Sequence, residues 1–209
     1  VVNISTDDSY AAAAAATTTA DNEELASLTV RDAFGGTLDR LDANSFKGDL
    51  TIGEDTAAVN IDAFTATGGG DVTLYENIDG KEKSNYTVIT GSGEDNLTVN
   101  VNGDAVDTVG TSFALTSGEG ADTVTVSMTN PHSQSTMTEL DNLDINLGDG
   151  DDTLLLNGEG NFDIDAGTGN DFVEIDAGTT GAAGSWTFGA ASVSTETVAN
   201  TFAAASTGD

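Results

Sequence analysis

The stretch Gly148–Ile175, GDGDDTLLLNGEGNFDIDAGTGNDFVEI, decides the fold of this chain. Its apolar residues alternate with polar ones, and acidic, glycine-rich segments separate these runs at nearly even spacing. Alternation with a period of two is typical of half-buried β-strands, and glycine with aspartate marks the turns between them. Written in nines, LDINLGDGD, DTLLLNGEG, NFDIDAGTG and NDFVEIDAG each contain one strand and one glycine-bearing corner.

The same corner occurs four times in the chain. GSGEDNLTV starts at Gly91, GEGADTVTV at Gly118, GDGDDTLLL at Gly148 and GTGNDFVEI at Gly167, and all fit G-x-G-x-D-x-U-x-U, where U is apolar. A shorter copy, GGGDVTL, starts at Gly68. A short repeat of strand and turn predicts rungs that stack and bury their apolar residues against one another. We therefore expect an all-β protein with a parallel β-roll or β-helix solenoid.

The rest of the chain divides around this solenoid. Residues 1–28 hold a polyalanine run and a threonine cluster, and they predict a short helix around Asn22–Leu28 after an extended or flexible stretch. This segment is expected to act as a linker or to dock on a neighbouring subunit. Residues 29–185 are expected to form the solenoid, with the repeats strongest at 91–178. Residues 186–209 are expected to cap its open end or to join subunits by adding a strand.

The composition excludes several functions. Of 209 residues, 36 are acidic and only 5 are Lys or Arg, which gives a net charge of −31. Without a basic patch the chain is not expected to bind nucleic acid or an anionic membrane surface, and its longest apolar run, Ala11–Ala16, is too short for membrane insertion. Such a charge fits a disordered chain, a high-salt protein or a cation-binding one. The alternating strands argue against disorder.

Cysteine is absent, which excludes a disulfide scaffold, a thiolate nucleophile and a zinc–thiolate site. The corners themselves suggest a different metal. Glycine permits the tight bend, which is expected to point carbonyl oxygens inward, and the aspartate adds a carboxylate. Two stacked corners would then supply the oxygen ligands that Ca²⁺ prefers.

The spacing places the corners relative to one another. With one strand and one corner every nine residues, successive corners fall on opposite edges, so corners about 18 residues apart share an edge. Gly148 and Gly167 form such a pair. Gly158 and Gly178 are expected on the other edge, where Asn161 replaces the aspartate and the site should be weaker or absent.

The predicted calcium-binding residues are the two glycines and the aspartate of each corner. These are Gly91, Gly93, Asp95, Gly118, Gly120, Asp122, Gly148, Gly150, Asp152, Gly167, Gly169 and Asp171. The alternative is that aspartate is present only because it favours turns. The acidic residues between them, Glu94, Glu119, Asp149 and Asp151, are expected to be solvated.

These nonapeptides resemble the glycine- and aspartate-rich repeats of the repeats-in-toxin family, whose motif is G-G-x-G-x-D-x-U-x. Thr90, Ser117, Leu147 and Ala166 stand where that family has its first glycine. The resemblance implies a calcium-bound parallel β-roll in a protein that is exported, commonly by type I secretion. Upstream, Thr37–Phe64 resembles repeats of bacterial surface-layer proteins, which implies an exported bacterial protein at the cell surface.

Few residues suggest catalysis. The carboxylates are numerous and no pair stands out, and the single histidine, His132, lies in a predicted loop over Thr129–Asn142. The aromatic residues Phe113, Phe162, Phe172 and Trp186 fall in strand patterns and are expected to be core or stacking residues.

The sequence thus predicts a non-enzymatic extracellular structural protein, stabilised by Ca²⁺, that assembles with itself into a surface layer or filament. Cell-surface polysaccharide is a second candidate partner. Two alternatives remain open: a calcium-dependent adhesin segment or stalk of a larger exported protein, and a polysaccharide-acting enzyme on a β-helix.

Overall fold

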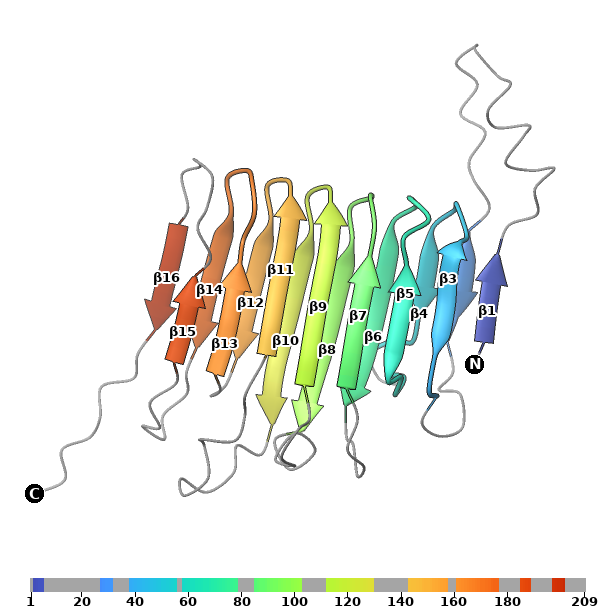
Figure 1. Ribbon diagram of the computed structural model, residues 1–209, viewed down its shortest axis with the longest axis horizontal. Coiled ribbons are helices and arrows are strands. Elements are labelled where there is room, and N and C mark those ends of the chain that lie inside the picture. Colours follow the sequence, from blue (N-terminus) through green and yellow to red (C-terminus); the bar gives the residue numbers. More distant parts are fainter. Residues whose placement is uncertain are drawn as a thin grey trace, which may run out of the picture.

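The computed structural model describes residues 2–5, 27–31, 38–55, 58–78, 85–102, 112–129, 143–157, 161–176, 185–188 and 197–201. Over these ranges the protein is all-β, with two eight-stranded sheets in which every pair of strands is parallel (Figure 1). One sheet holds β1 (Val2–Ser5), β3 (Leu41–Ser45), β5 (Ala63–Ala66), β7 (Asn85–Thr90), β9 (Ser112–Glu119), β11 (Leu143–Asp149), β13 (Asn161–Asp165) and β15 (Ser185–Phe188). The other holds β2 (Leu28–Val30), β4 (Leu50–Ile52), β6 (Val72–Ile78), β8 (Asn96–Asn102), β10 (Thr123–Thr129), β12 (Thr153–Asn157), β14 (Phe172–Asp176) and β16 (Thr197–Thr201).

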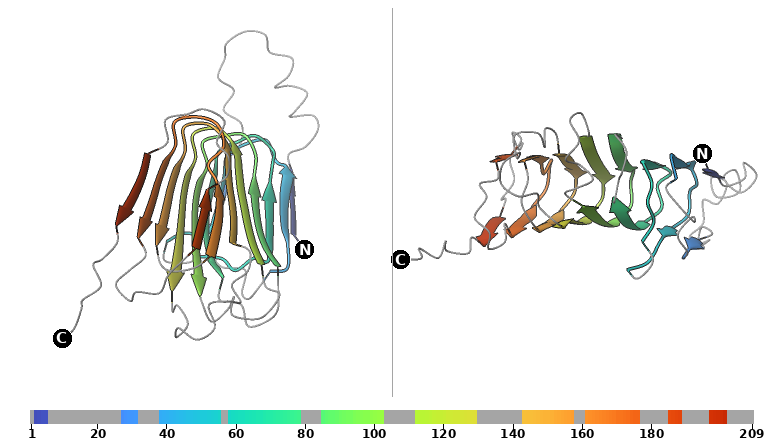
Figure 2. Two further views of the ribbon diagram at one scale, coloured as in Figure 1. Left: turned by 60° about the vertical axis from the view of Figure 1, so that its left-hand side comes forward. Right: turned by 90° about the horizontal axis from the view of Figure 1, so that it is seen from below.

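The chain alternates between the two sheets. Each strand is followed by one in the opposite sheet, and each strand pairs with the next but one in sequence. We call an odd strand, the corner after it and the following even strand a rung. Further views show the sheets facing each other along the molecule (Figure 2). Strands β1 and β2 lie at one end of the stack, and β15 and β16 lie at the other.

The core lies between the sheets and follows from the two-residue alternation. In β6 the burial alternates along VTLYENI, so that Val72, Leu74 and Ile78 are buried while Thr73 and Tyr75 are half-buried. Parallel pairing stacks such positions in register, so Leu74 lies beside Leu97 of β8. Phe113 in β9 is fully buried, as predicted.

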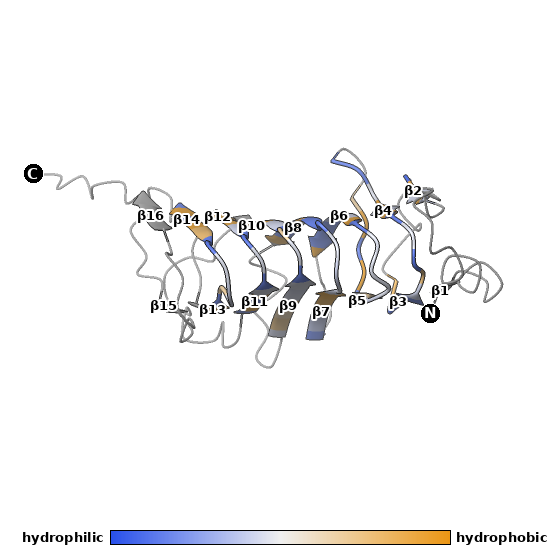
Figure 3. Ribbon diagram, turned by 90° about the horizontal axis from the view of Figure 1, so that it is seen from above, coloured by the Kyte–Doolittle hydropathy of each residue, from blue (hydrophilic) through white to orange (hydrophobic). Residues whose placement is uncertain are grey.

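The described corners from odd to even strands, those between β3 and β14, lie along one edge, the upper one in Figure 1. Figure 3 looks down on this edge and shows hydrophilic segments recurring at the corners between the sheets. The predicted stacking of Gly148 and Gly167 is confirmed: the Thr168 N–H donates to the Gly148 carbonyl at 2.8 Å. Gly158 and Gly178 lie outside the described residues.

Other predictions meet the structure only in part. The helix expected around Asn22–Leu28 lies mostly outside the described residues, and Leu28 itself begins a strand. Phe172 takes a half-buried, outward position between the buried Asp171 and Val173. His132 and most of the loop over Thr129–Asn142 are not described, nor are the side chains of Phe162 and Trp186. In the part that is described, no helix is long and apolar enough to cross a membrane.

Candidate cation site

The four G-x-G-x-D corners stack directly on one another. We call the segments Gly91–Asp95, Gly118–Asp122, Gly148–Asp152 and Gly167–Asp171 the glycine corners. The parallel pairing continues through them, since Ser92 is bridged to Glu119, and Gly118 and Asp149 pair with Gly148 and Thr168. All twelve predicted ligand residues therefore lie on the same edge of the molecule.

Close approach between rungs explains the two glycines in each corner. A Cβ added to Gly120 would overlap the carbonyl oxygen of Gly93, and one added to Gly150 would overlap that of Gly120. The first glycine of the corner is equally confined, because a Cβ on Gly148 would overlap the Gly118 carbonyl oxygen. The backbone also adopts positive φ there, 129° at Gly120 and 95° at Gly148, which glycine accepts without steric cost.

The backbone of the glycine corners is hydrogen-bonded from rung to rung. The Glu119 N–H donates to the Gly91 carbonyl at 2.8 Å, and the Gly120 N–H donates to the Asp149 carbonyl at 2.8 Å. The expectation that the bend points its carbonyl oxygens inward is therefore wrong for these groups. They point along the stack because the ladder of the sheets continues around the corner.

The aspartates of the corners form a buried column. We call Asp95, Asp122, Asp152 and Asp171 the aspartate column; each is 1–2 % exposed. Each carboxylate accepts, through Oδ1, a backbone N–H of the preceding rung. The donors are Val72 to Asp95 at 2.8 Å, Asp95 to Asp122 at 2.9 Å, Asp122 to Asp152 at 2.8 Å and Asp152 to Asp171 at 3.0 Å.

The second oxygen of each carboxylate in the aspartate column accepts no hydrogen bond. Oδ2 is buried and has no hydrogen-bond partner in any of the four residues. The Thr90 and Ser117 hydroxyls lie beside Asp95 and Asp122 and lower the pKa of these carboxyls, but their hydrogen bonds go to the Ser117 carbonyl at 2.7 Å and the Leu147 carbonyl at 2.8 Å. A buried carboxylate oxygen without a partner carries a large desolvation cost. A proton or a cation on the column would offset this cost.

The electrostatics of the column lead to the same requirement. Burial raises the pKa of Asp152 to about 7, where the Asp122 N–H works against the shift and the neighbouring carboxylates add to it. Burial also raises the pKa of Asp95 to about 6 and lifts the pKa of Asp122 above its ordinary value. At a strand spacing of about 4.8 Å, two unit charges repel by about 3 kcal/mol at an effective dielectric constant near 20. Four ionised neighbours are not stable without a counter-charge.

The acidic residues between the ligand positions behave differently. Glu94, Glu119, Asp149 and Asp151 are exposed, as predicted. Asp151 accepts the Asn170 N–H at 2.8 Å, and Asp149 accepts the Thr168 hydroxyl at 2.7 Å. In these outer hydrogen bonds the later rung donates to the earlier one, whereas in the aspartate column the earlier rung donates to the later one. They satisfy corner groups without burying charge.

The carboxylates of the corners could bind a hard cation only together with other oxygen ligands. Among the described residues, no three or more His, Cys, Asp or Glu side chains gather closely enough to hold a metal by themselves. A cation on the aspartate column would take Oδ2 from successive carboxylates and complete its shell with other oxygens. Carboxylate and carbonyl oxygens are the ligands that hard cations such as Ca²⁺ prefer.

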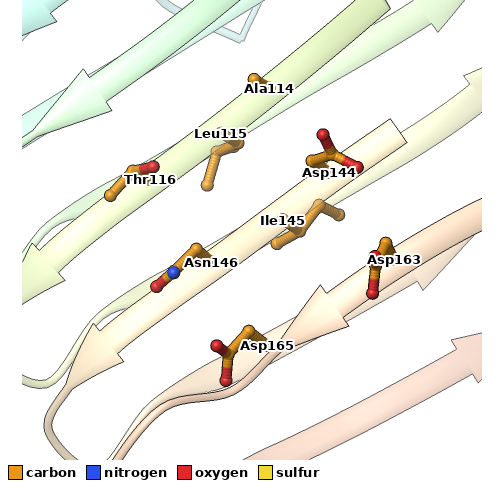
Figure 4. Close-up of a pocket in the computed structure, with 8 residues that line it drawn as sticks. All are labelled: Ala114, Leu115, Thr116, Asp144, Ile145, Asn146, Asp163 and Asp165. Carbon is orange, nitrogen blue, oxygen red and sulfur yellow. The ribbon is translucent and has the colours of Figure 1, made fainter. Parts of the chain in front are cut away.

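A second acidic group lies on the outer face of the odd-strand sheet. An open hollow of about 370 Å³ is lined by Ala114, Leu115, Thr116, Asp144, Ile145, Asn146, Asp163 and Asp165 (Figure 4). Asp144 lies in register with Asp163, and Asn146 with Asp165. The sequence alone did not single out these residues, although the alternation in LDIN and FDID places them on one face.

Glu76 is a buried acid that sequence reasoning missed. It is fully buried in β6, and its Oε1 accepts the Ile61 N–H at 3.2 Å while Oε2 has no partner. Burial raises the pKa of Glu76 to about 8; the Ile61 N–H lowers it and Asp62 raises it further. Its inward position in the alternating segment Val72–Ile78 was the signal that could have revealed it.

Comparison with protein-family models, with curated proteins and with solved structures found no match. Functional inference therefore depends on the geometry of the corners and of the aspartate column.

Proposed function

We propose that this chain is a non-enzymatic structural protein of the cell exterior, wound as a β-roll solenoid that Ca²⁺ stabilises and that assembles with further copies into a layer or filament. The aspartate column carries the proposal, because it places four buried carboxylates in a row along one edge, each with an unpartnered Oδ2. Divalent cations bound there offset the charge repulsion between the rungs.

The residues of the glycine corners have distinct roles in this proposal. Asp95, Asp122, Asp152 and Asp171 would hold the cations, since their Oδ2 atoms have no partner while their Oδ1 atoms bond the preceding rung. The glycines allow the rungs to approach closely enough for this stacking. Bound Ca²⁺ supplies positive charge and no redox chemistry, so its contribution is to stability.

Repetition supports a structural role rather than a catalytic one. The same corner is built four times in register, whereas an active site requires one distinctive set of groups with matched pKa values. Calcium sites built from carboxylates and carbonyls in extracellular modules work at roughly 10⁻⁴–10⁻³ M. A weak, repeated site of this kind suits a protein that becomes stable after export.

Self-assembly is tested by electron microscopy and sedimentation of the purified chain in calcium and in excess chelator. We expect regular sheets or fibres in calcium that disappear on chelation. A chain that remains monomeric at high concentration in calcium would contradict self-assembly. Calcium-dependent binding of that monomer to a surface would then support the adhesin alternative.

A further inference from the structure

The molecule has two ends that differ and are complementary. Strands β1 and β2 form one end, β15 and β16 form the other, and every pair between them is parallel (Figure 1). Among the described residues, no strand pairs with the outer side of these four. Strand β16 pairs in parallel with β14, and β2 pairs in parallel with β4. The free edge of β16 can therefore accept the free edge of β2 as a further parallel strand.

These end strands lack most of the features that usually prevent strand addition. Natural edge strands are commonly protected by charged side chains, proline or bulges. The four end strands read VNIS, LTV, SWTF and TVANT, with no charged residue and no proline in a chain of 36 acidic residues. The register of β1 against β3 does shift between Asn3 and Ser5. The other three pair without a shift.

Strand β2 shows which groups face outward. The Leu28 N–H donates to the Asp49 carbonyl at 2.8 Å, and the Val30 carbonyl accepts the Gly53 N–H at 2.8 Å, so these two residues bond to β4. Because alternate residues of a strand bond to opposite neighbours, the N–H and C=O of Thr29 point away from β4. Leu28 and Val30 pack against the core while remaining partly exposed. The apolar interior thus extends to this end.

Charge distinguishes the two ends as well. All five Lys and Arg residues precede Ser84, and Arg31, Arg40 and Lys47 lie between β2 and β4 in the sequence. Arg31 follows β2 directly and is exposed. Strands β13 and β14, next to the other end, carry Asp163, Asp165, Glu174 and Asp176 without a cationic residue. The end at β1 and β2 is less acidic than the other end rather than cationic, because Arg40 is paired with Asp42 at 2.8 Å and further acids lie nearby. Contact between unlike ends therefore brings together less like charge than contact between two copies of the acidic end.

We propose that chains stack head to tail, with β1 and β2 of one copy extending the two sheets beyond β15 and β16 of another. This inference rests on the proposed self-assembly and specifies its contact. The partner is a second copy of this chain, because its β1 and β2 can pair with β15 and β16 in the same parallel way in which neighbouring strands pair within one chain. Such a heterologous contact does not close on itself and gives an open filament.

The continuous register predicts which residues meet. In the even-strand sheet, Thr29 belongs to a row formed by successive partners. This row is Thr29, Thr51, Thr73, Asn96, Thr123, Thr153, Phe172 and Thr197. A second copy added in this register brings its Thr29 beside Thr197. Adjacent strands are about 4.8 Å apart, within the Cα–Cα range of a disulfide.

Cysteine pairs test this register directly, since the chain has no cysteine of its own. The double variant Thr29→Cys with Thr197→Cys, oxidised in calcium under assembling conditions, should give a series of covalent oligomers on a non-reducing gel. The single variant Thr29→Cys should give none. Covalent dimers from Thr29→Cys alone would show head-to-head contact and overturn the proposal, as would an assembled double variant that does not cross-link.

A proline substitution tests the hydrogen bonds of the edge. Thr29→Pro removes the N–H that points away from β4 and leaves the bonds of Leu28 and Val30 in place. It should weaken association about tenfold or more, as measured by sedimentation. The matched variant Thr29→Val keeps the N–H and should assemble like the original chain. Equal assembly of both variants would contradict the proposed contact.

The two proposals fail in different ways. If the unsubstituted chain does not assemble in calcium, self-assembly is wrong and the end contact is wrong with it. If the chain assembles but Thr29→Pro has no effect and the cysteine pair does not cross-link, only the head-to-tail contact is wrong.

Discussion

The first described rungs and the later ones differ at one position of the corner, where the later rungs have a buried aspartate and the early rungs have an apolar residue. In the corners before β4 and β6, the acids Asp49 and Asp71 are exposed, and each accepts an N–H from the following rung. In the glycine corners the aspartate is buried and accepts an N–H from the preceding rung. Leu50 and Val72 of the early rungs are buried where the strands begin. An exposed carboxylate closes a corner without a counter-charge, whereas a buried one requires a proton or a cation.

The largest effect should come from the close approach of the rungs. Gly120→Ala would force a Cβ against the Gly93 carbonyl oxygen, and the two rungs can relieve that overlap only by separating. We expect a loss of more than about 5 kcal/mol, enough to prevent folding. Circular dichroism and urea unfolding measure this loss.

Gly69 provides the control for that substitution. Gly69 also has a positive φ, 100°, but its Cβ would meet only the Ser92 hydroxyl at 3.2 Å. Gly69→Ala should therefore cost only about 1–2 kcal/mol. Equal losses at Gly69 and Gly120 would mean that φ alone, and not the close approach of neighbouring rungs, requires glycine at Gly120.

The next largest effect concerns Glu76, the buried acid of the early rungs. Its pKa in the folded state, about 8, lies above the ordinary value of 4.5. The folded chain therefore holds this proton more tightly, so stability is fully present below pH 4.5 and is lost as the pH rises through 8. The full loss is about 5 kcal/mol. Glu76→Gln should remove this part of the pH dependence in urea unfolding measured from pH 5 to 9.

An exposed glutamate serves as the control for Glu76→Gln. Glu119→Gln changes the same charge on an exposed corner residue and should leave the pH profile of the original chain unchanged. A Glu76→Gln profile that keeps the original slope would contradict burial of an ionisable group at this position.

These cases also show what the sequence can predict. Alternation of apolar residues and repeated glycines predicted the parallel strands and the stacking of Gly148 with Gly167, because both depend on local periodicity. The polarity of the corner hydrogen bonds was not predictable, since it depends on which rung supplies the donor. Glu76 was missed for a related reason. Its alternation places it inside, but its partner Ile61 lies 15 residues away in sequence and is found only in the folded chain.

A medium effect is expected when one buried carboxylate is neutralised. Asp152→Asn keeps an oxygen for the Asp122 N–H but removes the charge. In chelator the variant should melt at the same temperature as the original chain or higher, because burying the charge was unfavourable. In calcium it should lose about 2.7 kcal/mol, the contribution of one site at a hundredfold excess over Kd. Differential scanning calorimetry in both conditions measures this.

Asp149→Asn is the matched control in the same corner, where the residue is exposed. It should retain the calcium response of the original chain. If Asp149→Asn and Asp152→Asn lose the same part of that response, burial does not distinguish the aspartate column from the outer acids.

The smallest effect concerns the hydroxyl groups beside the column. Ser117 donates to the Leu147 carbonyl at 2.8 Å and is fully buried. Ser117→Ala should cost about 1 kcal/mol in urea unfolding, since a carbonyl loses one donor while a methyl group remains. No change in the unfolding free energy would show that this hydroxyl does not contribute to rung stacking.

The central claim is that the aspartate column binds calcium, and the most direct measurement is the melting temperature of the unsubstituted chain at neutral pH in calcium and in excess chelator. At a hundredfold excess over Kd, each occupied site adds about 2.7 kcal/mol. For a chain of this size that is about 5–10 °C per site. A melting temperature that rises by this amount in calcium is the predicted result. An identical melting temperature in calcium and in chelator would contradict the claim.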